Sequence, residues 1–131
     1  MILGTGTDIV KTERMSELYK KYGDRLLLKI LHQKEIEVFH KLPLSKKCSY
    51  IAKRFSAKEA LVKSLGTGFN DKVFLNDICI VNDKFGKPYY DVSARLDRYI
   101  KEIFMVEHYK IHLSISDDKD YAVALSIIEK I

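Results

Sequence analysis

The chain has 131 residues and a formal net charge of +5, from 23 Lys or Arg residues and 18 Asp or Glu residues. Hydrophobic residues make up 47% and charged residues 31%, which is typical of a globular domain and excludes a disordered chain. No apolar run approaches the roughly 20 residues that a membrane-spanning helix needs. The first residues form no secretory signal, and two cysteines cannot build a disulfide framework, so we expect a single cytoplasmic domain over residues 1–131.

The positive charge indicates a polyanionic partner but does not identify it. Nucleic acid, an acidic protein and a phosphorylated small molecule all fit a charge of +5. A lysine-rich surface that only keeps the protein in solution fits equally well.

The first half of the chain predicts one strand followed by helical segments. Residues 2–10 form the strand, in which Gly4 and Gly6 mark places where a ligand or another backbone comes close. Asp8 lies near the end of this strand, so its carboxylate is either partly buried or lines a site. The segments that follow are a helix that Thr12 caps and Gly23 ends, a short apolar segment at 24–31, a helix at 33–42, and a long helix at 45–65 that Gly66 ends.

The second half predicts two pairs of antiparallel strands around one helix. A strand at 77–81 turns into a short return strand at 89–92, and Ser93 caps a helix that runs to about Met105. Residues 109–116 alternate between apolar and polar side chains, with His112 on the outer face, and pair with a strand at 121–128. The sum is an α+β fold in which an antiparallel sheet packs against three or four helices.

A carboxylate interrupts the apolar stripe of the long helix. Glu59 follows Phe55 by four residues, and Lys63 follows Glu59 by another four. One interpretation is an ordinary helix ion pair, with Asp8 as a cap at the end of its strand. The other is that Asp8 and Glu59 bind Mg²⁺, which commonly bridges one or two carboxylates to substrate phosphates, while Lys63 meets phosphate.

Five motifs in register over nearly the whole chain resemble one family. They are GTGTDIV at 4–10, RFSAKEALVKSLGTG at 54–68, GKP at 86–88, HLSIS at 112–116 and YAVA at 121–124. They resemble the holo-acyl-carrier-protein synthases, the short bacterial-type 4′-phosphopantetheinyl transferases. The resemblance implies transfer of the 4′-phosphopantetheine arm of coenzyme A to a serine of apo-acyl-carrier protein, with release of adenosine 3′,5′-bisphosphate, in support of fatty acid biosynthesis.

The resemblance also implies roles for the three central residues. Asp8 and Glu59 match the family positions that bind Mg²⁺, and Lys63 matches a position that contacts the phosphates. The acceptor serine must lose a proton, and Glu59 is the expected base, either directly or through a water on the metal.

Further roles follow for the ligand-binding surfaces. Arg54, Gly66 and His112 match positions near coenzyme A, and Arg14 matches one that meets the acidic recognition helix of the carrier, with Arg25 extending that patch. The family implies a homotrimer with the site at the subunit interface, and neither nucleic acid nor membrane as a partner.

Two departures and two alternatives accompany this hypothesis. Asp117 stands where many members have a second histidine, so we expect it to point away from bound phosphates. Leu61 replaces a frequent aromatic residue, for which we expect a local packing change.

The first alternative function is a small basic nucleic-acid-binding domain, which would use Tyr89 and Tyr90 to stack bases. A relative that only binds coenzyme A would not need its carboxylates.

Overall fold

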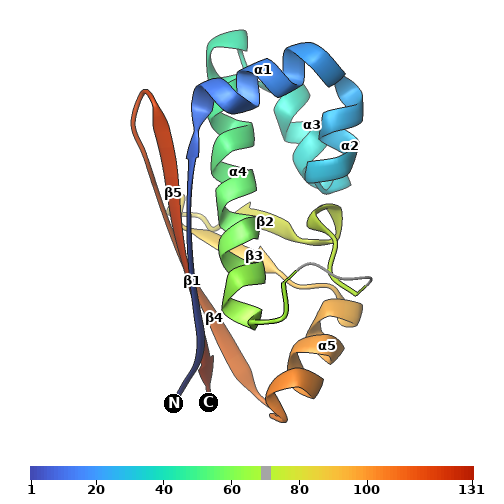
Figure 1. Cartoon of the computed structure of the whole chain (residues 1–131), viewed down its shortest axis with the longest axis vertical. Coiled ribbons are helices and arrows are strands. Elements are labelled where there is room, and N and C mark those ends of the chain that lie inside the picture. The colour runs from blue at the N-terminus through green and yellow to red at the C-terminus, as the bar shows by residue number, and fades with distance from the viewer. Residues whose placement is uncertain (69–71) are drawn as a thin grey trace.

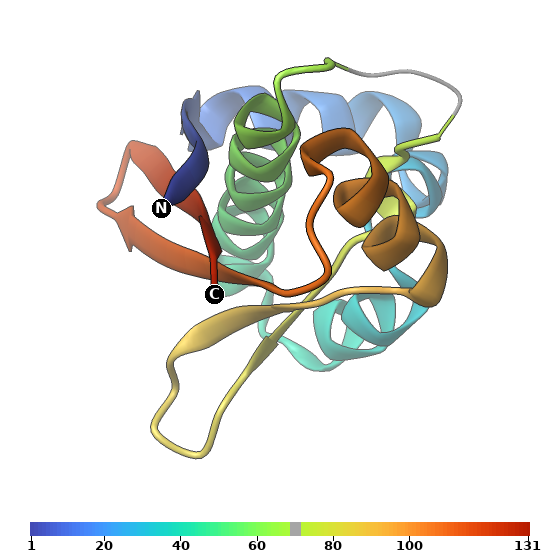
Figure 2. The ribbon, with the colours of Figure 1, turned by 90° about the horizontal axis from the view of Figure 1, so that it is seen from below.

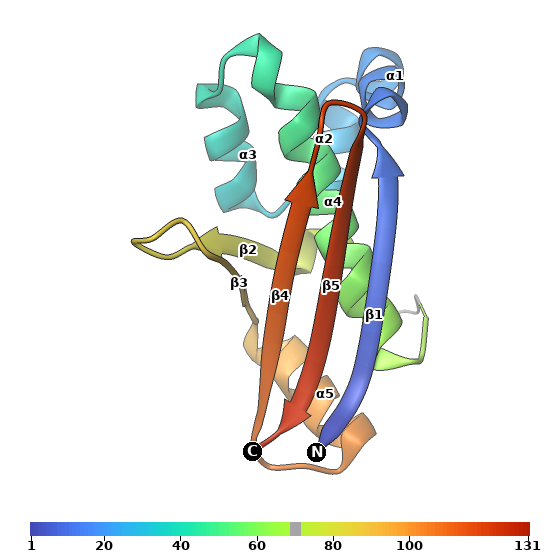
Figure 3. The same ribbon diagram turned by 90° about the vertical axis from the view of Figure 1, so that its left-hand side faces the viewer.

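A computed structural model describes residues 1–68 and 72–131 of the protein. Three long antiparallel strands form its main sheet in the order β1-β5-β4 (Figure 3). Their bounds are β1 Ile2–Lys11, β4 Tyr109–Asp117 and β5 Tyr121–Lys130. Burial alternates along β5, where Ala122, Ala124 and Ser126 face inward, as expected for a sheet with one covered face. The sheet therefore has an inner face on the core and an outer face that no described helix covers.

A single long helix, α4 (Leu44–Leu65), lies along the inner face and organises the rest (Figure 1). Twelve of its 22 residues are buried, four of them polar or charged, so the helix is covered by its neighbours on more than one side. Its first half packs with helices around the N-terminal core, and its second half packs with the C-terminal core. The other helices are α1 Thr12–Tyr22, α2 Asp24–Ile30 and α3 Gln33–Lys41 at one end, and α5 Ala94–Phe104 at the other.

A second, two-stranded sheet projects from the body of the molecule as a hairpin (Figure 2). A 3₁₀ turn, η1 (Leu75–Asp77), precedes its strands β2 (Cys79–Asn82) and β3 (Pro88–Asp91). The Asp83 side chain accepts hydrogen bonds from the backbone N–H groups of Phe85 and Lys87, which fixes the turn between the strands.

The predicted α+β class with antiparallel strands is confirmed, but two counts were wrong. The strands form two sheets rather than one. The described residues contain five α-helices rather than three or four, because the short apolar segment after Gly23 forms α2. A seven-residue helix is marginal by itself, and α2 is held by burying Leu26, Leu27 and Ile30.

Local signals at element ends were right in most places. Gly23 and Gly66 end helices, and the Ser93 hydroxyl accepts a hydrogen bond from the Leu96 N–H at 3.2 Å as the predicted cap. Thr12 is instead the first helical residue, and its N–H donates to the Asp120 carbonyl at 2.9 Å. The neighbouring β4–β5 turn therefore replaces the side-chain cap. No helix in the described ranges has the length and apolar character needed to cross a bilayer.

Candidate active site

The site begins where strand β1 lies against helix α4 without intervening side chains. A Cβ added at Gly4 would lie 1.9 Å from the Ser64 carbonyl oxygen, and one added at Gly6 would lie 2.0 Å from the Ala60 carbonyl oxygen. The prediction that these glycines mark the close approach of another backbone is confirmed. Alternate residues of a strand share a face, so Asp8 follows Gly4 and Gly6 on the face that meets α4.

Asp8 and Lys63 form an ion pair across this strand–helix contact. The Lys63 ammonium lies 3.1 Å from Asp8 Oδ1 and also donates to the Thr7 carbonyl at 3.0 Å. The Asp8 side chain is only 14% exposed, and its Oδ2 atom is buried without a hydrogen-bond partner. An unpartnered buried carboxylate oxygen is costly, which indicates that this oxygen is kept for a ligand.

Glu59 lies one helical turn before Lys63 and is half-buried. Burial is the main cause that raises the pKa of the Glu59 carboxyl, and the neighbouring Asp8 charge adds to it, while Lys63 and Arg14 act in the opposite direction. Among the described residues, no ion pair joins Glu59 to Lys63. The interpretation of these two residues as an ordinary helix ion pair is therefore wrong, because Lys63 reaches across to β1 instead.

This donor set fits a hard divalent cation. Asp8 and Glu59 provide carboxylate oxygens, one oxygen of Asp8 lacks a partner, and the charge of Asp8 contributes to the raised pKa of Glu59. Within residues 1–68 and 72–131, no group of three or more His, Cys, Asp or Glu side chains gathers as a metal cluster. A cation here would thus have two protein ligands, as is common for Mg²⁺ that also binds substrate phosphates.

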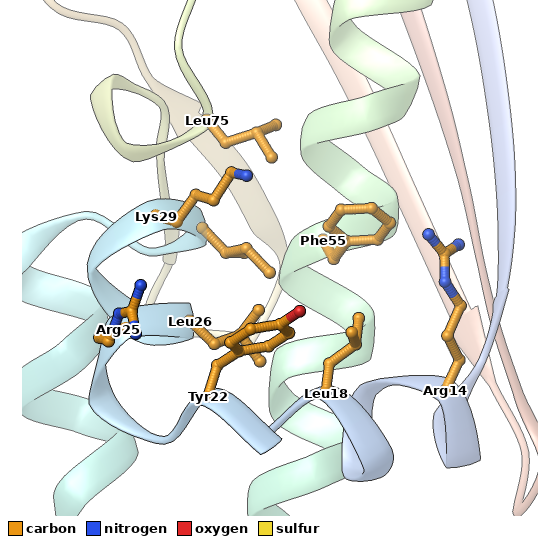
Figure 4. Close-up of a pocket in the computed structure, with 9 residues that line it drawn as sticks. Arg14, Leu18, Tyr22, Arg25, Leu26, Lys29, Phe55 and Leu75 are labelled. Atoms are coloured by element: carbon orange, nitrogen blue, oxygen red, sulfur yellow. The ribbon is translucent and has the colours of Figure 1, made fainter. Parts of the chain in front are cut away.

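Two adjoining pockets form a groove along the side of α4, and Glu59 lines one of them. Figure 4 shows the other, which Arg14 and Arg25 line. One section, of about 570 Å³, is lined by Lys29, Phe55, Glu59, Val73, Phe74, Leu75 and Asn76. An adjoining section, of about 480 Å³, shares Lys29, Phe55 and Leu75 and adds Arg14 and Arg25 at its rim. The Arg14 guanidinium lies 5.7 Å from the centre of the Phe55 ring. The groove therefore combines an apolar floor with a cationic rim, and it contains both arginines predicted to meet the carrier protein.

The residues predicted to contact coenzyme A have other partners within this chain. Arg54 is buried, its Nη2 donates to Asn82 Oδ1 at 2.9 Å, and its Nε lies 3.6 Å from a Glu35 carboxylate oxygen. His112 Nε2 lies 2.8 Å from a Glu129 carboxylate oxygen on the outer face of the sheet. Gly66 has a φ of 76° at the end of α4, three residues after Lys63. The structure thus joins Asp8, Glu59 and Lys63 but does not bring Arg54 and His112 to them.

Sequence reasoning missed two parts of the site. The groove wall formed by Phe74, Leu75 and Asn76 has no motif that would have revealed it. The buried partner of Arg54, Glu35, had a detectable but local signal: it stands three residues after His32, and the two form a capping box at the start of α3. Nothing in that spacing indicates that Glu35 also receives charged groups from α4.

The sequence model of the 4′-phosphopantetheinyl transferase superfamily matches residues 4–126. This match covers nearly all of the chain and both elements that carry the carboxylates. The protein belongs to this superfamily.

Within the superfamily, the similarity is to the holo-[acyl-carrier-protein] synthases. The synthase of Ehrlichia canis is 46% identical over 98% of this chain and 94% of its own. The crystal structure of the Neisseria meningitidis synthase superposes with a TM-score of 0.90 at 37% identity, covering 99% of this chain and 100% of that one. The Bacillus anthracis synthase, solved in complex with CoA (3′,5′-ADP), gives a TM-score of 0.82 at 34% identity over 100% and 99% of the two chains. The resemblance predicted from the motifs is confirmed.

Proposed function

We propose that this protein transfers the 4′-phosphopantetheine arm of coenzyme A to a serine hydroxyl of an apo-acyl-carrier protein, in the cytoplasm and in support of fatty acid biosynthesis. The products are holo-acyl-carrier protein and adenosine 3′,5′-bisphosphate. The observation that carries the proposal is the meeting of Asp8, Glu59 and Lys63, of which Glu59 lines a groove with a cationic rim. The chain-long similarity to named synthases, one of them in complex with CoA (3′,5′-ADP), supports the same activity.

Asp8 and Glu59 are the residues that would hold Mg²⁺. When bound, Mg²⁺ supplies charge neutralisation to the pyrophosphate whose bond is broken. Lys63 brings a second positive charge: its side chain is 55% exposed, so its ammonium is able to turn from Asp8 toward a phosphate. A charge that is already placed beside the developing anion lowers the barrier without reorganisation during the reaction.

The acceptor serine must lose its proton as the new P–O bond forms, and Glu59 is the proposed proton acceptor. Burial and the charge of Asp8 raise the pKa of this carboxyl, and a base is most effective when its pKa lies near the working pH. Glu59 also lines the groove in which the arm would lie. The same side chain therefore has access to the reacting hydroxyl.

The two ends of the groove suit two different substrates. Arg14 and Arg25 at the rim would attract an acidic carrier protein and steer its approach. The apolar stretch around Phe55 and Phe74 would accept the pantetheine arm. Arg54, Gly66 and His112 are assigned to the nucleotide end of coenzyme A.

A homotrimer is the proposed assembly, with one transferase domain over residues 1–131 of each subunit. Arg54 and His112 do not meet Asp8 and Glu59 within one chain, which is consistent with a site completed between subunits. The outer face of the sheet also exposes contiguous apolar side chains on β1 and β5, among them Ile9, Val123 and Leu125. Exposed apolar patches of this kind mark association surfaces.

The direct test is mass spectrometry of several apo-acyl-carrier proteins incubated with coenzyme A and this protein, with Mg²⁺ or with a chelator. We expect a mass gain of one phosphopantetheine group that requires both protein and Mg²⁺. The matched control replaces coenzyme A with pantetheine, which lacks the pyrophosphate. No gain with any carrier would contradict the proposal.

The structure weakens the nucleic-acid alternative at its key residues. Tyr90 is 8% exposed and its hydroxyl donates to the Ala57 carbonyl, so its ring has no face open for base stacking. Of these two tyrosines, Tyr89 is the exposed one. A relative that only binds coenzyme A is also disfavoured, because Asp8, Glu59 and Lys63 are all in place.

A further inference from the structure

A fully buried lysine lies beside Glu59 in the sequence and is not used by the chemistry proposed above. Lys58 has 0% exposure, and its ammonium donates to the Ile30 carbonyl at 2.7 Å, to the Leu75 carbonyl at 3.0 Å and to Glu35 Oε1 at 2.5 Å. These three bonds use every donor that an ammonium group has. The Lys58 side chain is therefore fixed in a single conformation.

Hydrogen bonds also fix the side chain of Glu35, the anionic partner of Lys58. Its side chain is 1% exposed, Oε1 also accepts the His32 N–H at 2.9 Å, and Oε2 accepts the Ile80 N–H at 3.0 Å. Through these bonds the Glu35–Lys58 pair connects α3 and β2 to α2, α4 and η1. Arg54, with its Nε 3.6 Å from Glu35 Oε2, adds a second cation to the cluster.

The two carbonyls that Lys58 binds belong to α2 and η1, two neighbouring segments that line the groove. Ile30 is the last residue of α2, directly after Lys29, and Leu75 is the first residue of η1. Lys29 and Leu75 line both sections of the groove, whereas Phe55 and Glu59 line it from α4. A second hydrogen bond joins α2 and η1 at the surface, where the Asn76 amide donates to the Leu28 carbonyl at 3.2 Å.

Stability is a weak explanation for such a cluster. Removing two charges from water costs several kcal/mol per ion in proteins, and hydrophobic replacements of buried pairs are often neutral or stabilising. Burial lowers the pKa of Lys58, against the attraction of Glu35. What the pair provides that an apolar side chain does not is a fixed direction toward two backbone carbonyls.

We propose that Lys58 is a positioning residue, whose buried ammonium, oriented by Glu35, holds α2 and η1 together where they line the groove that leads to Glu59. Its effect on rate rests on the proposed transferase function. Its effect on the contact between α2 and η1 does not depend on that function.

The test compares the wild-type protein with the double variant Glu35→Gln/Lys58→Met, which removes both charges and keeps similar volumes. The backbone amides of Asp77 and Ile78 report on η1, because they donate to the carbonyls of Phe74 and Leu75 and so close this turn. We expect a folded variant in which these amides exchange hydrogen at least about tenfold faster. We also expect kcat/KM for coenzyme A to fall by about tenfold or more, since small misplacements far from the chemistry are sufficient for such losses.

Lys101→Met is the matched control. It removes an exposed ammonium that pairs with Asp97 at 2.9 Å on α5, away from the groove. We expect wild-type exchange at Asp77 and Ile78 and wild-type kcat/KM in this variant.

The proposal is overturned if the folded double variant keeps wild-type exchange at Asp77 and Ile78, or if exchange rises while kcat/KM does not change. If the double variant does not fold, Glu35→Gln alone decides, because it removes the charge that orients the Lys58 ammonium and keeps a similar side chain: unchanged exchange at Asp77 and Ile78 in that variant then overturns the proposal. If the wild-type protein transfers nothing, the proposed function fails, and the exchange comparison still decides whether Lys58 holds α2 and η1 together.

Discussion

At the scale of single residues, the site is built around charges that are poorly satisfied in the protein alone. Asp8 keeps one buried oxygen without a partner, and Glu59 is half-buried beside it. Proteins tolerate such an arrangement where a ligand completes it, and a carboxyl whose pKa is raised by burial and by a neighbouring charge is a candidate for an active-site group. Lys63 supplies only part of the compensating charge, because it pairs with Asp8 and not with Glu59.

The first prediction concerns activity. Glu59→Gln removes the proposed base and metal ligand, and Asp8→Asn removes the other metal ligand, so each should lower kcat by about 10²-fold or more. Initial rates of carrier modification by mass spectrometry measure this, with circular dichroism to show that the fold is retained. Wild-type rates in both variants would refute the assignment of the carboxylates.

The second prediction concerns stability and pH. A carboxyl whose pKa is raised on folding binds more protons in the folded than in the unfolded state. Its contribution to the free energy of unfolding is therefore most favourable below the ordinary glutamate pKa, and it is lost as pH rises through the raised value. The pKa of Glu59 is raised. With a chelator present, Glu59→Gln should therefore be more stable than wild type near pH 7, and this advantage should shrink toward pH 4.

Urea unfolding at a series of pH values measures the second prediction. Added Mg²⁺ should stabilise the wild-type protein and not the variant, because only the wild type gains a ligand that binds the folded state. A wild-type protein that is the more stable of the two near pH 7 with chelator would contradict the prediction.

At the scale of elements, the relation between β1 and α4 sets the geometry of the site. Asp8 comes from the strand, and Glu59 and Lys63 come from the helix, so their separation depends on how closely the two backbones approach. That approach requires glycine at positions 4 and 6, where any Cβ would overlap a helix carbonyl. Packing at this contact therefore bears on chemistry as well as on stability.

The third prediction is that Gly6→Ala destabilises the fold and lowers activity. The added methyl group would lie 2.0 Å from the Ala60 carbonyl oxygen, and strand and helix must separate to accept it. Overpacking of this kind costs about 3 kcal/mol, measured as the free energy of unfolding in urea. Lys11→Ala, an exposed change on the same strand, is the control and should stay within about 0.5 kcal/mol of wild type. Equal stability of Gly6→Ala and wild type would contradict the prediction.

The sequence predicted those parts of the fold whose causes are local. Gly23 and Gly66 end helices because glycine adopts the backbone conformations needed there, and Ser93 caps α5 through its own hydroxyl. The segment that forms α2 was not predicted as a helix, because seven residues give too little periodicity and its stability comes from tertiary burial.

The same distinction applies to the site. Asp8, Glu59 and Lys63 were singled out from motifs and spacing, and the structure brings them together. The partner of Lys63 was not predictable, since Asp8 is 55 residues away in the chain. The burial of Lys58 against Glu35 was not predictable either, because a Lys–Glu pair separated by 23 residues has no sequence pattern.

At the scale of the whole molecule, the net charge of +5 is spread over surfaces with different proposed partners. Arg14 and Arg25 lie at the rim of the groove, where an acidic carrier would dock. The outer face of the sheet, which faces the viewer in Figure 3, differs from the groove because it exposes apolar side chains on neighbouring strands. These two surfaces give two predictions.

The fourth prediction is that Arg25→Glu raises the KM for apo-acyl-carrier protein by about tenfold and leaves the KM for coenzyme A unchanged, because opposite charge at a rim mainly alters encounter with the partner. Lys20→Glu makes the same change of charge on α1 outside the groove and should have a much smaller effect. The difference between the variants should decrease at high salt, which screens exposed charges. Steady-state kinetics at two salt concentrations measure this, and a normal KM in Arg25→Glu would remove that residue from the interface.

The fifth prediction tests the proposed homotrimer. Leu125→Glu places a charge in the middle of the outer sheet face, where Leu125 is 38% exposed in the isolated chain. We expect the wild-type protein to sediment as a trimer and this variant as a monomer without transfer activity. Met105→Glu alters an exposed apolar residue outside the sheet and should remain trimeric. A monomeric, active wild-type protein would contradict the proposal.

The two faces of strand β1 contact different parts of the proposed assembly. Gly4, Gly6 and Asp8 face α4, while Thr5, Thr7 and Ile9 alternate with them on the outer face of the sheet. If that outer face joins subunits, one backbone carries both the contact between copies and the carboxylate of the site. Specific activity should then depend on protein concentration, falling on dilution as subunits separate, and substitutions at Thr5 or Thr7 should change the rate although neither side chain faces the groove.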